Sequence, residues 1–504
     1  MRLLALALLG CLALPAPAAA DPLEMFPPAV LAKVKDRATL DPQIVAHLGY
    51  YEVYFDSEVD DVKWADSGEP YQVHRGDTIR IHGYLATPNF GGPYPGIVIG
   101  HGHGGKGSSE LALAVAALGY VALSIDGPEA GQSTGGPEDT EQTWISVEET
   151  INEPSPEIGF LYHYAYAGMR AITLLDDLSR LPFNPFRIDR ARFGVIGASM
   201  GGQFTYYVNG VDSRVNGAVA IAVAGDWRNL FSYEGAWLYH GLYYYTRDGL
   251  PSGDDFLNTV SNMCGDPTVD TFLGNFDPIA FAPRQNGPLL TIIGTHDQYF
   301  TIPAINTTYD QVGSAGTSPR FIKRIMLTPN GKHGVIDKDN LLPTVLPLLR
   351  TVHNWFKYCF NDGPMPPGTP TVQMALKGNR MVFRVATTAG GSSIQKVRLH
   401  WATQLDTRPA APCDFTTVRL HYARGTYHGS VRLGARPACG PEATPENVLY
   451  YASVTDAAAY TISSKIYYGP QEMAFGSGFV PVIEHFPRDS FPVPPPPVCM
   501  TTPN

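Results

Sequence analysis

The stretch that most constrains this sequence is Arg192–Gln203, in which a short apolar run stops at Gly197-Ala198-Ser199-Met200-Gly201. Residues 193–196 are typical of a buried strand, and residues 203–208 favour a helix directly after it. A serine between a strand and a helix, with glycines two residues before and after it, fits a nucleophile elbow, because small neighbours let the chain approach itself closely. The pentapeptide alone also fits a glycine-rich turn. The interpretation as an elbow therefore needs a base, an acid and an anion site elsewhere in the chain.

The first twenty residues are typical of a secretory signal. They contain Arg2, an apolar run over residues 3–14, and three alanines before Asp21, a pattern that predicts cleavage after Ala20. The apolar run is shorter than a membrane span, and no other run reaches that length. We therefore expect a secreted or periplasmic protein with no membrane partner.

The formal net charge of −11 argues against a nucleic-acid partner, because phosphates demand a basic surface. The length of 504 residues suits two or three domains with a large core. The sequence indicates no particular oligomeric state.

Strands and helices alternate along residues 21–360, which predicts an α/β domain with a mostly parallel sheet and helices on both faces. The expected strands are 50–55, 77–85, 95–100, 120–126, 193–196, 217–224, 289–297 and 321–327, and the expected helices are 109–118, 160–181 and 341–360. An aromatic-rich segment, about 227–288, predicts a cap inserted into this domain. Within it we expect Trp227, Trp237 and Tyr243 to wall a substrate pocket.

Asp297 and His333 each follow a predicted strand, where an open α/β sheet places its functional residues. A serine hydroxyl needs a base within hydrogen-bond reach to act as a nucleophile. His333 would take the proton of Ser199, and Asp297 would hold the imidazole in the required tautomer. Each residue alone fits a solvated loop, but three suitable residues at three strand ends favour a catalytic triad of Ser199, Asp297 and His333.

The turn His101-Gly102-His103-Gly104-Gly105 also follows a predicted strand. Its glycines leave backbone amides able to face a substrate oxygen, and with the amide of Met200 the turn predicts an oxyanion hole. The His-x-His spacing also fits a metal site, but no third ligand completes the set. We therefore expect neither a metal ion nor a cofactor.

Taken together, the chain resembles secreted α/β-hydrolases of the dienelactone hydrolase and acetyl xylan esterase type over residues 45–360. The motifs that carry the resemblance are residues 100–105, 126–133, 197–202, 294–297 and 331–334. The resemblance implies an α/β-hydrolase fold and a serine esterase acting on a small-molecule or polymeric ester. It also implies His103 and Met200 as the oxyanion donors, with Gly104 as a further candidate.

Two features depart from a minimal member of that type, namely the long loop over residues 126–157 and the aromatic cap. Triad chemistry also serves a prolyl-oligopeptidase-like serine peptidase. A third interpretation is a non-catalytic binding protein on a hydrolase scaffold.

The composition changes after residue 360. Residues 361–370 are typical of a Pro-rich linker, and short β-like runs over 371–485 predict an immunoglobulin-like β-sandwich. Residues 486–504 are a Pro-rich tail. The sandwich suits either a polymer-binding module or a domain that docks on the catalytic part.

Five cysteines follow the predicted cleavage site, and export permits disulfides. Cys413 and Cys439 lie in the same β-rich segment, so we predict that they pair. A pairing of Cys359 with Cys499 is a second hypothesis, and it leaves Cys264 without a partner.

Overall fold

The computed structural model describes residues 25–59, 78–128, 130–134, 160–231, 273–297, 299–316, 321–336, 341–403, 414–437 and 441–472. The predicted signal, the centre of the predicted cap with Trp237 and Tyr243, and the Pro-rich tail lie outside these residues. The predicted pairing of Cys413 with Cys439 also lies outside them.

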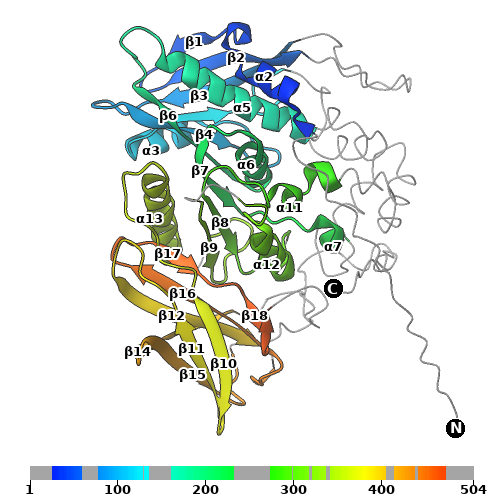
Figure 1. Ribbon diagram of the computed structural model, residues 1–504, viewed down its shortest axis with the longest axis vertical. Helices are drawn as coiled ribbons and strands as arrows, with labels where there is room; N and C mark the ends of the chain where they lie inside the picture. The colour runs from blue at the N-terminus through cyan, green and yellow to red at the C-terminus, as the bar shows by residue number, and fades with distance from the viewer. Residues whose placement is uncertain are drawn as a thin grey trace, which may run out of the picture.

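A nine-stranded sheet organises the described part of the first 360 residues, in the order β1-β2-β3-β5-β4-β6-β7-β8-β9 (Figure 1). Its strands are β1 (Gln43–Ala46), β2 (Tyr51–Val59), β3 (Thr78–Ala86), β4 (Tyr94–Gly100), β5 (Val121–Ile125), β6 (Ile188–Ala198), β7 (Val215–Ile221), β8 (Leu289–Gly294) and β9 (Lys323–Thr328). The strands from β5 to β9 in this order run parallel, whereas β1, β2 and β3 pair antiparallel. This mixed, mostly parallel sheet confirms the predicted α/β-hydrolase-type fold.

Helices cover both faces of the sheet, as predicted, because each face buries its own apolar cluster (Figure 1). One face carries α5 (Phe160–Ser179) and α6 (Met200–Val211), and the other carries α3 (Ser109–Ala117) and α13 (Leu341–Cys359). The remaining described helices are α2 (Pro28–Lys35), α7 (Trp227–Phe231), α11 (Pro278–Phe281), α12 (Ile302–Gln311) and the short 3-10 helix η1 (Arg37–Thr39). No helix in these described ranges is long and apolar enough to cross a membrane.

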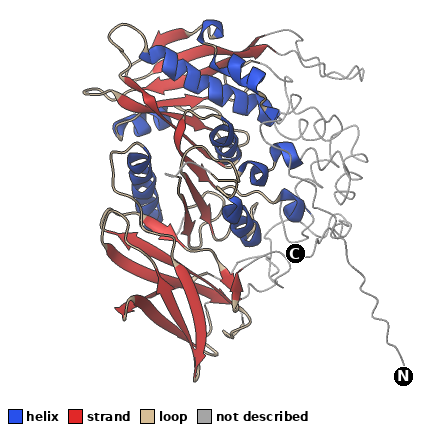
Figure 2. Ribbon diagram, viewed as in Figure 1, coloured by secondary structure: helices blue, strands red, loops and turns tan. Residues whose placement is uncertain are grey.

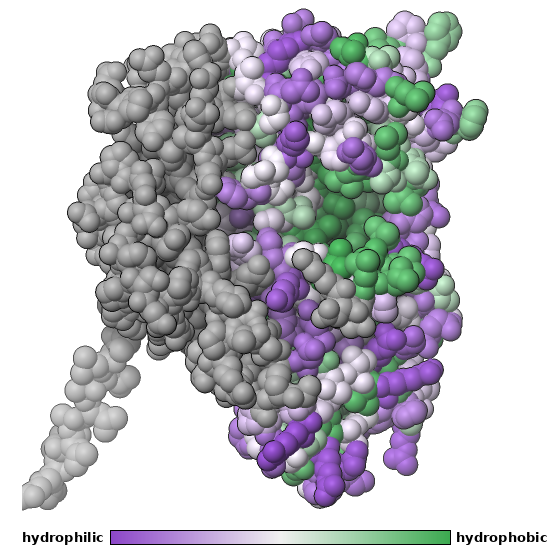
Figure 3. Space-filling view, turned by 180° about the vertical axis from the view of Figure 1, so that it is seen from behind, coloured by the Kyte–Doolittle hydropathy of each residue, from purple (hydrophilic) through white to green (hydrophobic). Residues whose placement is uncertain are grey.

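The outer surfaces of α3 and α13 carry several exposed apolar side chains. The exposed leucines of these two helices are Leu111, Leu113, Leu341, Leu342, Leu346 and Leu349. Figure 3, seen from behind, shows apolar side chains gathered around a hollow on this side of the molecule.

Strands β10–β19, residues 371–472, form two antiparallel sheets after the α/β part of the chain (Figure 2). We call these two sheets the C-terminal β-unit. One sheet has the order β10-β11-β15-β14 and the other β13-β12-β16-β18-β19, with β17 paired to β16. The strands are β10 (Thr371–Lys377), β11 (Arg380–Ala386), β12 (Ile394–Thr403), β13 (Thr416–Arg419), β14 (His421–Ala423), β15 (Thr426–Arg432), β16 (Val448–Asp456), β17 (Thr461–Ser463), β18 (Tyr467–Tyr468) and β19 (Gln471–Glu472). Alternate residues of β11 point into a third apolar cluster between the sheets, as expected of half-buried strands.

Three sequence-based expectations differ from the structure. The strand expected over residues 217–224 ends at Ile221, because Ala222 takes a positive φ of 50° and turns the chain. Among the short β-like runs expected within 371–485, residues 461–468 form one run in the sequence but two strands in the structure, β17 and β18. Cys359 is a free thiol, so its predicted pairing with Cys499 is wrong.

Candidate active site

Ser199 lies at the sharp turn between β6 and α6. Its backbone has φ 59° and ψ −120°, a conformation that non-glycine residues rarely adopt, and its amide donates to the carbonyl of Ile221 at 2.9 Å. A Cβ on Gly197 would lie 2.2 Å from the carbonyl oxygen of Gly201, and a Cβ on Gly201 would lie 2.4 Å from that of Gly100. Both positions therefore require glycine, for the steric reason that the sequence suggested.

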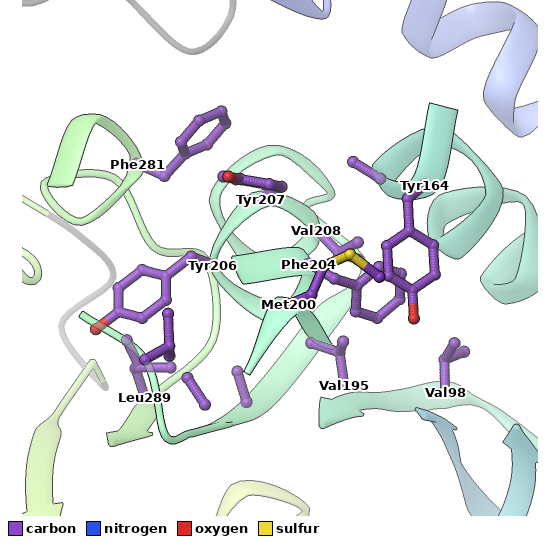
Figure 4. Close-up of a cluster of buried hydrophobic side chains, with 14 of the residues drawn as sticks. Val98, Tyr164, Val195, Met200, Phe204, Tyr206, Tyr207, Val208, Phe281 and Leu289 are labelled. Atoms are coloured by element: carbon purple, nitrogen blue, oxygen red, sulfur yellow. The ribbon is translucent and has the colours of Figure 1, made fainter. Parts of the chain in front are cut away.

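The first turn of α6 is fixed by packing below the serine. Figure 4 shows Met200 and Phe204 of α6 gathered with Tyr164 above Val98 and Val195 of the sheet. All five side chains are buried in the same apolar cluster. This packing leaves the helix little freedom to rotate, so the position of Ser199 is set by the core.

His333 lies between Ser199 and Asp297. Its Nε2 is 2.8 Å from Oγ of Ser199, and its Nδ1 is 2.9 Å from Oδ2 of Asp297. Because a carboxylate can only accept, Nδ1 carries the proton and the lone pair of Nε2 faces the serine hydroxyl. The structure thus brings together the three residues that the sequence singled out, although they are separated by up to 134 positions.

The carboxylate of Asp297 is held by backbone amides as well as by His333. Oδ1 accepts from the amides of Tyr299 and Phe300 at 2.9 and 3.0 Å. The ring of Tyr299 also lies 4.3 Å from the imidazole of His333, centroid to centroid. The side chain of Asp297 is fully buried, whereas that of His333 is 20% exposed, so His333 faces the surface and Asp297 lies behind it.

The glycine-rich turn lies beside the serine. A Cβ on Gly102 would be 3.5 Å from Cβ of Ser199, and the amide of Gly105 donates to the carbonyl of Gly102 at 3.0 Å. His103 and Gly104 are exposed in this turn, and Gly104 has a φ of 65°. Met200 is the first residue of α6, where a helix has no carbonyl of its own to satisfy the amide.

The ring of His101 braces the turn internally. Its Nδ1 lies 2.8 Å from the carbonyl oxygen of Gly102, so this nitrogen donates, and its Nε2 accepts from the amide of Gly127 at 2.8 Å. Burial lowers the pKa of His101, which favours the neutral ring that this bonding requires. Both nitrogens are used, and the described residues contain no group of three His, Cys, Asp or Glu side chains that could hold a metal.

Two further residues support the turn, and the sequence did not assign them this role. The hydroxyl of Tyr164 accepts from the amide of His101 at 2.6 Å and lies 3.2 Å from its carbonyl. At the far end, Oδ1 of Asp126 accepts from the amide of Gly107 at 2.6 Å, and Oδ2 lies 2.7 Å from Nδ1 of the buried His82. The position of Asp126 at the end of a predicted strand was the available signal, whereas Tyr164 was indistinguishable from a core residue of its helix.

The predicted pocket residues are only partly described. Trp227 is buried at 5% exposure in the core, and its indole donates to the carbonyl of Ala224 at 3.2 Å. It therefore lies buried at the start of the predicted cap, and its role as a pocket wall stays a prediction. Trp237 and Tyr243 lie outside the described residues.

One protein-family model matches part of this sequence. Residues 161–410 match the PhoPQ-related family. That family is described as PhoPQ-activated pathogenicity-related protein, and the match covers slightly less than half of the chain. It is a different family from the one that the motifs resemble. None of the curated proteins matches the sequence.

Several solved structures are similar to this chain at low identity. An acetyl xylan esterase from Paenibacillus sp. R4 is 19% identical with a TM-score of 0.47, over 66% of this chain and 93% of that one. Acetyl xylan esterase 1 from Thermoanaerobacterium sp. JW/SL YS485 is 17% identical with a TM-score of 0.45, over 68% and 95%. An acylaminoacyl peptidase from Pyrococcus horikoshii is 14% identical with a TM-score of 0.40, over 62% and 49%. With scores this low, the description of the fold rests on the sheet order itself.

Proposed function

We propose that this protein is a serine hydrolase that cleaves a carboxylic ester through an acyl-enzyme, with no metal ion or cofactor. The observation that carries the proposal is the continuous hydrogen-bond chain from Ser199 through His333 to Asp297. The substrate class, a small-molecule or polymeric ester, follows from the resemblance of the motifs to esterases.

In the first step Oγ of Ser199 attacks the carbonyl carbon while Nε2 of His333 takes the hydroxyl proton. The imidazolium that forms is stabilised by Asp297, whose carboxylate accepts the Nδ1–H throughout. The carbonyl oxygen becomes an oxyanion, which the amide of Met200 and an amide of the adjacent turn, from His103 or Gly104, would bind. The positive end of the α6 dipole favours the same charge.

Collapse of the tetrahedral intermediate breaks the bond to the leaving oxygen, and His333 returns its proton to the departing alcohol. Ser199 then carries the acyl group. A water molecule attacks the acyl carbon, with His333 again taking a proton, and the second collapse releases the acid and restores the hydroxyl of Ser199.

A fluorophosphonate probe tests the nucleophile directly. We expect the folded wild type to be labelled, and Ser199→Ala to lose labelling and more than about 1,000-fold in turnover. Ser314→Ala, which changes an exposed serine after α12, is the matched control and keeps both. Labelling that persists in Ser199→Ala would refute the assignment, and an unlabelled folded wild type would favour a binding protein.

Substrate class is tested with two panels of chromogenic compounds. We expect hydrolysis of p-nitrophenyl acyl esters and little turnover of aminoacyl p-nitroanilides. Preference for the anilides would instead establish a peptidase. We also propose export with cleavage after Ala20, and a mature N-terminus other than Asp21 would contradict that site.

A further inference from the structure

Phe415 is a residue of the C-terminal β-unit that contacts both the loop of Asp297 and the loop of His333. It precedes β13 and is buried at 5% exposure. Although it belongs to the β-unit, it packs in the main apolar cluster of the hydrolase sheet, together with Tyr451 and Leu449 of β16. The core is therefore continuous across the two parts of the chain.

The ring of Phe415 is held between two other rings. On one side it meets His296, next to Asp297, edge to face at 6.1 Å between centroids. On the other side it meets Tyr451 at 5.5 Å, and Tyr451 stacks on His400 at 4.5 Å. This row of rings runs from the β-unit to the loop that carries Asp297.

The ring of His400, at the far end of this row, is held by two hydrogen bonds. Its Nδ1 lies 2.9 Å from Oγ1 of Thr417 and its Nε2 lies 2.8 Å from Oγ of Ser453, so both ring nitrogens have partners. Burial lowers the pKa of His400 to about 3, and the ring stays neutral at ordinary pH. His400 therefore adds no charge to the stack behind Phe415 over the pH range in which histidines usually titrate.

The backbone of Phe415 contacts the loop that carries His333. Its amide donates to Oδ1 of Asn330 at 2.7 Å, three residues before His333. The amide of Asn330 in turn donates to Oγ1 of Thr295 at 2.8 Å, two residues before Asp297. Asn330 is thus bonded through its backbone amide to the loop that carries Asp297, and through its side chain to the β-unit.

We propose that Phe415 and Asn330 are positioning residues, through which the β-unit holds the Asp297 and His333 loops at the separation that lets one imidazole reach both Asp297 and Ser199. The proposal rests on the proposed function of Ser199. Without the anchor, the two loops keep their direct backbone contact, the His296 amide to the Gly331 carbonyl at 2.9 Å. We therefore expect a small displacement and not unfolding, and a displacement of about 1 Å at a catalytic group is enough to lower a rate about 100-fold.

Asn330→Gly isolates the contact in the full-length protein. Asn330 has a φ of 62°, which glycine adopts without strain, so the variant removes the acceptor for Phe415 and leaves the backbone permitted. Asn361→Gly is the matched control, because Asn361 has a φ of 64° and lies exposed at the end of α13. Phe415→Leu, which keeps an apolar side chain but removes the aromatic ring, tests the row of rings independently.

Three measurements are made on each variant: the rate of fluorophosphonate labelling, kcat and KM for a p-nitrophenyl ester, and the thermal midpoint. We expect Asn330→Gly to stay folded, to lose about tenfold in kcat and in labelling rate, and to keep KM within about twofold. Asn361→Gly should match the wild type in every readout.

The outcomes separate this proposal from the proposed function. If the wild type is labelled at Ser199 but folded Asn330→Gly and Phe415→Leu keep its labelling rate and its kcat, the positioning role is overturned and the hydrolase stands. A KM change with unaltered kcat also overturns it, because that result places Asn330 in substrate binding. If the folded wild type is not labelled, both proposals fail.

Discussion

The hydroxyl of Tyr164, on α5, is bonded to both backbone groups of His101, accepting from the amide at 2.6 Å and lying 3.2 Å from the carbonyl oxygen. These two residues are 63 positions apart, and the tyrosine ring is fully buried. A core side chain thereby fixes the start of the turn proposed to bind the oxyanion. Through these two contacts, α5 helps to fix the position of the turn beside Ser199.

We expect Tyr164→Phe to lower kcat about tenfold and to leave KM nearly unchanged, because the oxyanion forms only in the transition state. Loss of the hydroxyl also removes the hydrogen bonds to two part-buried backbone groups, which should lower the free energy of unfolding by about 1–3 kcal/mol. Tyr206→Phe is the control, since that buried hydroxyl bonds to Thr291 in β8. It should lose stability without the loss of kcat, as measured by steady-state kinetics and urea unfolding.

Gly201→Ala should destabilise the elbow. Its Cβ would meet the carbonyl oxygens of Gly100 and His101 at 2.4 and 2.8 Å, and backbone cannot give way as a flexible side chain can. We expect the free energy of unfolding to fall by about 1–3 kcal/mol or more, measured by denaturant titration. A Cβ on Gly334 meets nothing within 4 Å, so Gly334→Ala should keep the stability of the wild type. Equal stability of the two variants would contradict the steric account.

Burial of two carboxyls beyond β7 predicts a pH-dependent stability. Burial raises the pKa of Asp277 to about 8 and that of Asp226 to about 6, against an unfolded value of about 3.9. Between about pH 4 and 8 the folded state therefore binds more protons than the unfolded state, so the contribution of these groups to stability falls as the pH rises.

Asp277→Asn tests this assignment. The variant removes one titrating group, so the dependence of the unfolding free energy on pH should flatten by at most about 1.4 kcal/mol per pH unit. Asp41→Asn, at a carboxylate that is 83% exposed, should leave the dependence unchanged. Urea unfolding at several pH values between 5 and 8 measures both, and an unaltered slope in Asp277→Asn would show that Asp277 is ionised in the folded protein.

The α/β part of the chain should not fold without the β-unit. The amide of Leu327, in the edge strand β9, donates to Oγ of Ser463 at 3.0 Å, and Asn306 of α12 bonds to both backbone groups of Ile466 at 2.8 and 3.2 Å. Truncation after residue 370 would expose these buried groups together with the shared core. We expect such a fragment to be insoluble or to unfold without a cooperative transition, and a soluble fragment with a sharp thermal transition would disprove the dependence.

Much of the fold followed from local patterns in the sequence. Apolar runs such as residues 95–100 and 289–294 are buried strands, because a parallel sheet covered on both faces needs apolar side chains on both. The helix expected over 160–181 ends within two residues of α5. Short elements were missed, including β1, β13 and β14, whose residues are largely exposed and carry little apolar signal.

The sequence by itself determined which residues follow which strand, and hence that Ser199, Asp297 and His333 would gather at one edge of the sheet. The need for glycine at 197 and 201 could also be predicted from the sequence, because an elbow restricts the size of the residues two positions before and after the serine. Only the tertiary structure decided what holds these groups in place, namely Tyr164 under the turn and Phe415 behind Asn330. Such contacts join residues 63 and 85 positions apart, and they depend on how whole elements pack, for which no local periodicity in the chain provides a signal.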